Sequence, residues 1–126
     1  MSVLVDTSVW VDHFRQRNAG LIDLILLDQA LTHPMVVAEL ACGTPPTPRE
    51  RTLADIALLQ GAHQASLQEV MAMVERDCLF GLGCGLVDLV LLASTRITPG
   101  ARLWTMDKRL ANLAQRFGVA HQAPVH

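Results

Sequence analysis

The feature that most constrains the fold is the run Val3-Leu4-Val5, which is short, wholly apolar and β-branched at two positions. Such a run is typical of a central strand that is buried on both faces of a parallel sheet. Parallel strands need long crossover connections, and amphipathic helices are predicted over residues 7–14 and 19–30. The chain is therefore expected to build a sheet that carries helices on its faces.

The rest of the chain continues this alternation of strands and helices. Leu31-Thr32-His33 is predicted as a second strand, and Pro34 as the first residue of a helix that Gly43 ends. Three prolines within residues 45–48 indicate a stiff surface connection. Further helices are predicted over 48–60, 66–79, 86–95 and 108–117, and further strands over 101–105 and 119–120, with a turn or minor strand over 61–65. These elements predict an α/β fold: a three-layer α/β/α sandwich with a mostly parallel sheet of four to five strands.

The bulk properties favour one small domain. A chain of 126 residues that is 51% hydrophobic can close a single core, so one domain over residues 1–126 is expected. Apolar stretches stay far below the roughly 18 residues of a membrane span, and Asp6 interrupts the N-terminus where a secretory signal would be apolar. We therefore expect no membrane contact and a cytoplasmic protein. The cysteines, Cys42, Cys78 and Cys84, form no C-x-x-C pair and are expected to be small buried residues.

Four acidic residues occur where a parallel sheet would gather them. Asp6 follows the first strand and Asp107 a late one, while Glu39 and Asp88 lie early in helices. Ligands in open α/β sheets bind beyond the carboxyl ends of the strands, so all four can converge on one cleft. Taken singly, Asp6 and Asp107 are explained equally well as helix caps. Glu39 and Asp88 stand in apolar stretches, where a solvated helix face is a poor explanation.

Carboxylates brought together repel one another unless a cation offsets their charge. Oxygen-only ligation suits Mg²⁺ or Mn²⁺, which take one or two carboxylates directly and leave the others to act through water. A metal-activated water at such a site hydrolyses phosphodiesters. The acids therefore predict a metal-dependent phosphodiesterase.

The net charge of −2 argues against a nucleic-acid-binding protein, because such proteins usually present a basic surface. Carboxylates around a metal count as negative here, although a bound cation would neutralise them. The sequence has no Tyr, and its few aromatic residues are expected mostly in the core, so base stacking is given a minor role. Basic residues could hold RNA phosphates, with a solvated helix face as the alternative for each. These candidates are Lys108, Arg109, Arg15, Arg17, Arg49 and Arg51.

Four segments together resemble the PIN domain and, among PIN domains, the VapC-like toxins. The resemblance covers essentially the whole chain, in the family's order and at its length. Each motif alone is weak, whereas four in register are specific. The segments are Asp6-Thr7-Ser8-Val9-Trp10, Val36-Val37-Ala38-Glu39-Leu40, Leu86-Val87-Asp88-Leu89 and Leu103-Trp104-Thr105-Met106-Asp107-Lys108-Arg109-Leu110.

The resemblance implies dependence on Mg²⁺ or Mn²⁺, endonucleolytic cleavage of RNA, a homodimer, and inhibition by a DNA-binding VapB-like antitoxin. The sequence departs from some relatives, which carry a further acid where Lys108 and Arg109 stand. Thr7 or Ser8, together with Thr105, would orient the carboxylates. The implied acidic quartet is Asp6, Glu39, Asp88 and Asp107, with Asp6 and Asp88 foremost as direct metal ligands.

Other readings of the motifs fit less well. Gly81-x-Gly83-x-Gly85 matches neither the dinucleotide-binding fingerprint nor the P-loop. Ser8 with His13 or His33 lacks the strand–turn–helix elbow of a serine nucleophile, and an aspartyl nucleophile would want a second acid where Ser8 stands. The non-enzymatic alternative is a catalytically silent PIN-like interaction module. Mg²⁺-dependent cleavage of RNA separates this alternative from a nuclease.

Overall fold

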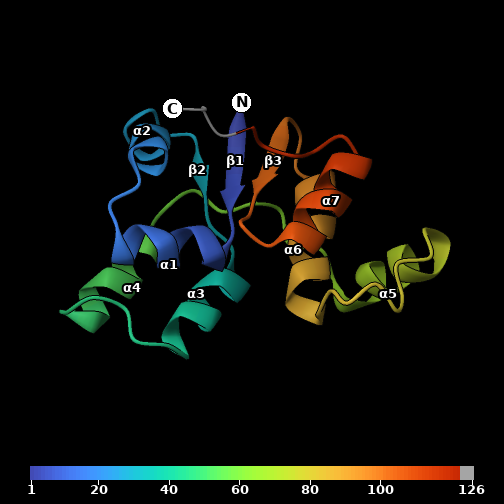
Figure 1. The fold of residues 1–126 in the computed structure, drawn as a ribbon, viewed down its shortest axis with the longest axis horizontal. Coiled ribbons are helices and arrows are strands. Elements are labelled where there is room, and N and C mark those ends of the chain that lie inside the picture. Colours follow the sequence, from blue (N-terminus) through green and yellow to red (C-terminus); the bar gives the residue numbers. More distant parts are fainter. Residues whose placement is uncertain (123–126) are drawn as a thin grey trace.

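The computed structural model describes residues 1–122, which form a three-stranded parallel sheet surrounded by helices (Figure 1). The strands are β1 (Ser2–Val5), β2 (Ala30–Leu31) and β3 (Ala101–Trp104), in the order β2-β1-β3. Val3 pairs with Ala30, and Val5 pairs with Trp104. The apolar residues of β1 are buried, so the predicted central strand is confirmed.

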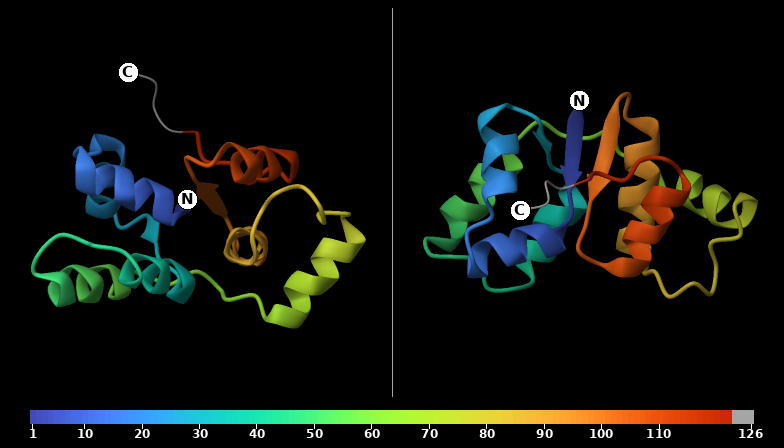
Figure 2. Two further views of the ribbon diagram at one scale, coloured as in Figure 1. Left: turned by 60° about the horizontal axis from the view of Figure 1, so that its bottom comes forward. Right: turned by 45° about the horizontal axis from the view of Figure 1, so that its top comes forward.

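Helices cover both faces of the sheet, which confirms the predicted three-layer α/β fold. The chain crosses from β1 to β2 and then back past β1 to β3, and right-handed crossovers that run in opposite directions place their helices on opposite faces. The left view of Figure 2 shows α1, α2 and α7 on one face, and α3, α4 and α6 on the other. The helices are α1 (Thr7–Arg15), α2 (Ala19–Leu26), α3 (Pro34–Ala41), α4 (Arg49–Ala57), α5 (Leu67–Arg76), α6 (Leu86–Ile97) and α7 (Lys108–Arg116).

The sheet has three strands within residues 1–122, fewer than the four to five that were predicted. The stretches expected as minor strands form single bridges, between Thr32 and Gly61 and between Leu103 and Ala120. Beyond Gly61 the backbone is held by side chains of α6 and its C-cap, because the amide of residue 65 donates to the hydroxyl of Ser94 and the amide of residue 63 to that of Thr98. Side-chain hydroxyls thus take the place of the backbone acceptors that a strand over residues 61–65 would have used.

Two further local predictions are corrected. The second helix ends at Leu26 rather than Ala30, because Asp28 adopts a positive φ of 57° and the chain then enters β2. The cysteines are not a buried set: Cys42 and Cys78 are exposed and Cys84 is half-buried. Cys42 occupies the C-cap of α3, and Cys78 has a positive φ of 55° in the turn after α5.

Helix α6 is the most deeply buried helix, with every residue from Leu89 to Thr95 inside the core. Its polar residues are satisfied there, since the Thr95 hydroxyl donates to the carbonyl of Leu91 at 2.7 Å. Because the rest of α6 is packed in the core, the backbone of its first turn, which carries Asp88, is fixed in position. Within residues 1–122 no helix combines the length and apolar character that crossing a bilayer requires.

His33 joins α3 to α6 and is only 3% exposed. Its Nδ1 accepts the Met35 amide at 3.0 Å and so caps α3, while its Nε2 lies 3.0 Å from the Ser94 hydroxyl. An accepting Nδ1 requires the neutral ring that carries its proton on Nε2. Burial lowers the pKa of His33, which favours that neutral form.

Acid is therefore expected to destabilise this protein through His33. The unfolded chain takes up a proton near the ordinary histidine pKa of about 6.5, before the folded chain does, so the free energy of unfolding falls as the pH drops below that value. Thermal melting from pH 8 to pH 5 measures the slope. His33→Asn keeps a capping side chain but removes the titration, and its melting temperature should fall less steeply. His121, whose pKa burial also lowers, remains in both proteins, so equal slopes would contradict the assignment to His33.

Candidate active site

The candidate site lies at the carboxyl end of the sheet. Asp6 directly follows β1, and its amide donates to the carbonyl of Trp104 at the end of β3 at 2.9 Å. This bond places the residues after β3, among them Thr105 and Asp107, beside Asp6. Figure 1 shows the arrowheads of β1 and β3 pointing toward α1, α3 and the first turn of α6.

Asp6 is the most deeply buried of the four acids, at 5% exposed. Its Oδ2 accepts hydrogen bonds from the hydroxyls of Ser8 at 2.6 Å and Thr105 at 2.7 Å, and a longer one from the Ser8 amide. The Ser8 hydroxyl in turn accepts the Met106 amide at 2.9 Å. Within residues 1–122 no hydrogen bond falls on Oδ1, so one oxygen of Asp6 is held in place and the other is available.

Glu39 lies in the second turn of α3, where the Thr7 hydroxyl donates to its Oε1 at 2.7 Å and ties α1 to α3. Its apolar sequence surroundings suggested a poorly solvated position, but the side chain is exposed. The reason is that α3 is only two turns long and buries Val36 and Leu40, one turn apart, which leaves Glu39 on the open side. A hydroxyl partner and solvent, rather than burial, surround this carboxylate.

Asp88 lies in the first turn of α6 and is half-buried, and its Oδ2 accepts the Gly85 amide at 3.4 Å. Its pKa is raised, first because burial desolvates the carboxylate and further because Asp6, Asp107 and Glu39 oppose its charge, whereas the Gly85 bond acts in the other direction. The negative charges of the other three acids thus all contribute to the raised pKa of Asp88.

Asp107 is exposed and serves as the N-cap of α7, accepting the Leu110 amide on Oδ1 at 3.0 Å. Its own amide donates to the Thr105 hydroxyl at 3.1 Å. Asp6 is likewise the N-cap of α1, so the capping interpretation holds for both residues. Capping and a place at the carboxyl edge are compatible, because helices that follow parallel strands begin at that edge.

The donor set fits a hard divalent cation, although the side chains do not yet surround a common point. Within residues 1–122 no three His, Cys, Asp or Glu side chains lie close enough, as they stand, to hold one ion. Each acid is engaged by its own cap or hydroxyl partner, and metal-free carboxylates repel one another. Closing the site around Mg²⁺ or Mn²⁺ therefore requires side-chain rotation toward Asp6.

Two basic residues follow Asp107 at the rim of the site. Lys108 is exposed at the first position of α7. The Arg109 guanidinium crosses to the loop before α6 and donates to the carbonyl of Gly83 at 3.3 Å. Gly83 has a φ of +86°, a conformation that favours glycine, and a Cβ there would lie 2.8 Å from Arg109 Nη1, so the guanidinium would have to shift.

The other basic candidates have different surroundings in the structure. Arg15 lines a cavity of about 540 Å³ together with Thr7 and Glu39, beside the acidic edge. Arg17 is exposed. Arg49 is exposed and donates to the carbonyls of Ala41 and Gly43, so it also caps the end of α3, a structural role that the sequence did not predict. Arg51 is exposed on α4.

Two features near the site, the role of His33 and the exposure of Phe80, were not predicted from the sequence. His33, which positions α3 and thereby Glu39, had no assigned role, although Pro34 after it is a signal for a helix start. Trp10 and Trp104 are buried as expected, but Phe80 is 61% exposed on the loop that leads to α6. No periodic pattern surrounds Phe80 from which its exposure could have been predicted.

Comparison with known proteins agrees with this arrangement. The PIN domain family matches residues 3–116. The chain is 43% identical over 118 residues to Ribonuclease VapC32 of Mycobacterium tuberculosis strain CDC 1551 / Oshkosh, and equally to that of strain ATCC 25618 / H37Rv, with 94% of both chains covered in each case. The fold, the acidic edge and these matches together show that the chain is a VapC-like member of the PIN-domain family.

Proposed function

We propose that this protein is a Mg²⁺- or Mn²⁺-dependent endoribonuclease and the toxin of a VapBC-like toxin–antitoxin pair. The observation that supports the proposal is that the charges of Asp6, Asp107 and Glu39, from three separate parts of the chain, all act on the carboxylate of Asp88 at the carboxyl edge of the sheet. The relatives at 43% identity are named as ribonucleases, which supports RNA as the substrate. The acids involved are Asp6, Glu39, Asp88 and Asp107.

In this proposal Asp6 and Asp88 would hold the ion directly, and Glu39 and Asp107 would bind waters beside it. A bound ion supplies a water of lowered pKa and stabilises negative charge on the departing oxygen. The chain itself keeps the carboxylates in position: Ser8 and Thr105 anchor one oxygen of Asp6. Such supporting hydrogen bonds commonly affect metal affinity or activity tenfold to a hundredfold.

Other residues hold the remaining charges of the site. The Thr7 hydroxyl fixes Glu39. Lys108 and Arg109 stand at the rim, where exposed basic groups can contact RNA phosphates on either side of the scissile bond. Arg15 and Arg17 extend this role along α1 and just beyond its end, since Arg15 shares a cavity with Glu39.

The same charges define the partner that would inhibit the enzyme. An arginine from a VapB-like antitoxin matches carboxylates bidentately, so we propose that such a side chain enters the acidic edge. The cavity of about 540 Å³ beside Glu39 provides space next to that edge. We further propose that the protein acts as a homodimer in the cytoplasm.

The direct test is cleavage of RNA by the purified protein. Mixed cellular RNA is incubated with the protein in Mg²⁺ or in EDTA, and the new ends are mapped by sequencing. Discrete cuts that appear only with the metal are expected. RNA that stays intact in Mg²⁺ and Mn²⁺, while the protein still binds its antitoxin, would contradict the proposal and favour the catalytically silent interaction module.

A further inference from the structure

Three arginines from three helices gather around Asp77, at the end of the molecule away from the acidic edge. Arg76 is the last residue of α5, Arg96 lies in the last turn of α6, and Arg116 is the last residue of α7. Arg76 and Arg96 both donate to Asp77 Oδ2, at 3.1 and 3.0 Å, and Arg116 donates to the carbonyl of Asp77 at 3.2 Å. We call these three residues the arginine cluster.

The arginine cluster has more positive charge than its neighbours offset. Asp77 is the one carboxylate that pairs with these arginines within residues 1–122, so two positive charges remain. The hydrogen bonds from Arg76 and then Arg96 lower the pKa of Asp77, which keeps it ionised and the two guanidiniums together. Each guanidinium carries five N–H donors, and the described contacts use one of each.

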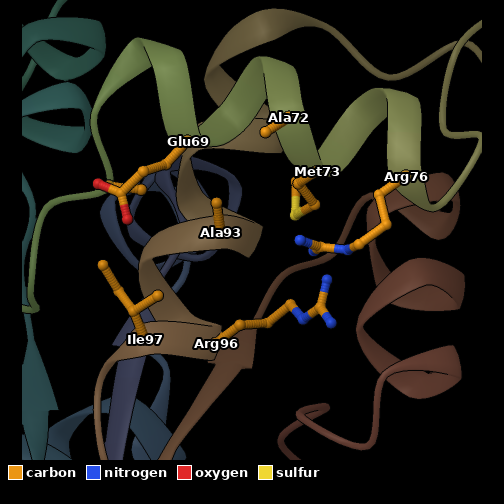
Figure 3. A pocket seen from close by; sticks show the side chains of 8 residues that line it. Glu69, Ala72, Met73, Arg76, Ala93, Arg96 and Ile97 are labelled. Atoms are coloured by element: carbon orange, nitrogen blue, oxygen red, sulfur yellow. The ribbon is translucent and has the colours of Figure 1, made fainter.

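The guanidinium groups are also held in orientation. Arg96 stacks over the Phe117 ring at 4.0 Å from its centroid, and Arg116 lies at 5.2 Å from the same ring. Figure 3 shows the guanidiniums of Arg76 and Arg96 facing one another across the mouth of a cavity, with Glu69 at its other end. Glu69 is occupied by the capping box with Ser66 and forms no ion pair with these arginines.

The cavity beside these groups is about 330 Å³ and has an apolar floor formed by Ala72, Met73 and Ala93. Side chains of Arg76 and Arg96 form its charged end. Planar guanidiniums with free donors match the oxygens of a phosphate, and Arg is the side chain best suited to this bidentate recognition. An anion with several acceptor oxygens is the ligand class that these donors suit.

The distribution of charge along the chain favours a polyanion as the ligand of the arginine cluster. Residues 1–66 contain four basic and seven acidic residues, whereas residues 67–122 contain six basic and five acidic ones, two of which are Asp88 and Asp107 of the acidic quartet. Positive charge thus collects on the side of α5, α6 and α7. Arg109 and Arg116 are seven residues apart on α7, which places them on one face about 10 Å apart along the axis.

These positions connect the arginine cluster to the acidic edge. Arg109 lies at the rim near Asp107, and Arg116 belongs to the cluster. On α6, Arg96 comes eight residues after Asp88, about 12 Å along the helix axis. A polyanion that crosses the acidic edge can follow the basic residues of α7 to the cluster.

We propose that Arg76, Arg96 and Arg116 bind a backbone phosphate of the RNA substrate several nucleotides away from the scissile bond. This inference rests on the proposed ribonuclease function and adds a second anchoring point for its substrate. A contact remote from the reacting atoms strengthens binding of substrate and transition state alike, so its loss raises KM and leaves kcat unchanged.

The experiment measures binding of a fluorescent single-stranded RNA in EDTA, where cleavage cannot interfere. Arg76→Gln removes a side chain that is 62% exposed, and Arg96→Gln removes its partner. Each variant is expected to weaken binding about tenfold at low salt. Each should also reduce the slope of log K against log salt by about 0.7. A trinucleotide, too short to leave the acidic edge, should bind equally to the wild type and both variants.

Matched variants separate charge from position. Arg102→Gln removes the same charge from β3, outside the arginine cluster, and should bind RNA like the wild type. Arg76→Lys keeps the charge and should recover most of the salt slope but not the full affinity. Melting temperatures check that Arg96→Gln, which loses an ion pair with Asp77, remains folded.

Each contrary outcome has its own meaning. If Arg76→Gln and Arg96→Gln bind RNA as tightly as Arg102→Gln does, the phosphate site is overturned. Cleavage of RNA by the wild type would still leave the proposed function intact. If these variants keep their affinity for RNA but no longer bind an acidic partner protein, RNA is not the ligand of the arginine cluster. A wild-type protein that neither binds nor cuts RNA in Mg²⁺ would overturn the proposed function itself.

Discussion

Asp6→Asn is expected to lower RNA cleavage by about a thousandfold or more while the fold is retained. The amide oxygen of asparagine can accept the same hydrogen bonds from Ser8 and Thr105 that Oδ2 accepts now. The substitution removes the negative charge from the most deeply buried of the four acids. Initial rates of cleavage in Mg²⁺ measure the loss, and circular dichroism checks the helical content.

Two further variants make this result specific. Asp88→Asn should reduce cleavage to a similar extent, because it removes the second proposed direct ligand. Asp55→Asn changes the net charge equally but lies exposed on α4, and it should cut RNA at the wild-type rate. Wild-type rates in both Asp6→Asn and Asp88→Asn would refute the assignment of the acidic quartet.

Removal of divalent metal is expected to abolish cleavage and to lower the thermal stability of the protein. EDTA should stop the reaction, and added Mg²⁺ or Mn²⁺ should restore it. A ligand that binds only the folded chain, present at ten times its Kd, stabilises it by about 1.4 kcal/mol, which for a chain of this size raises Tm by about 5 °C. Melting curves with and without Mg²⁺ measure this shift independently of activity.

Asp88→Asn tests where the ion binds. Burial and the neighbouring acids raise the pKa of Asp88, so its charge opposes folding of the metal-free protein at neutral pH. The neutral asparagine should therefore give, in EDTA, a Tm equal to or above that of the wild type. It should also lose the rise in Tm with Mg²⁺. An unchanged Mg²⁺ response in this variant would place the ion away from the acidic edge.

The positions of the four candidate acids relative to the strands and helices could be predicted because these positions depend on neighbouring residues of the chain. An acid after β1, an acid after β3, an acid in the helix after β2 and an acid in the first turn of α6 can each be predicted from the hydrophobic pattern and the turn residues. The carboxyl ends of parallel strands share one edge, so adjacency in space follows from the order of elements alone. For the same reason the three-layer fold followed from the alternation of strands and helices.

Features that depend on contacts between distant segments could not be predicted. The stretch after Gly61 forms a single bridge because hydroxyls of α6 and its C-cap bind the backbone of residues 63 and 65. Glu39 is exposed because the short helix α3 packs through only one side. Arg49 became a helix cap, and Cys42 and Cys78 lie outside the core.

The sequence by itself determined the class of fold, the central strand and the identity of the acids at the carboxyl edge, because backbone periodicity and strand ends are encoded within a few neighbouring residues. Only the tertiary structure decided which hydroxyl holds which carboxylate, how exposed each acid is, and that arginines at the ends of α5, α6 and α7 meet around Asp77. Such meetings depend on how helices pack against one another, and packing is a property of the whole chain rather than of any window within it.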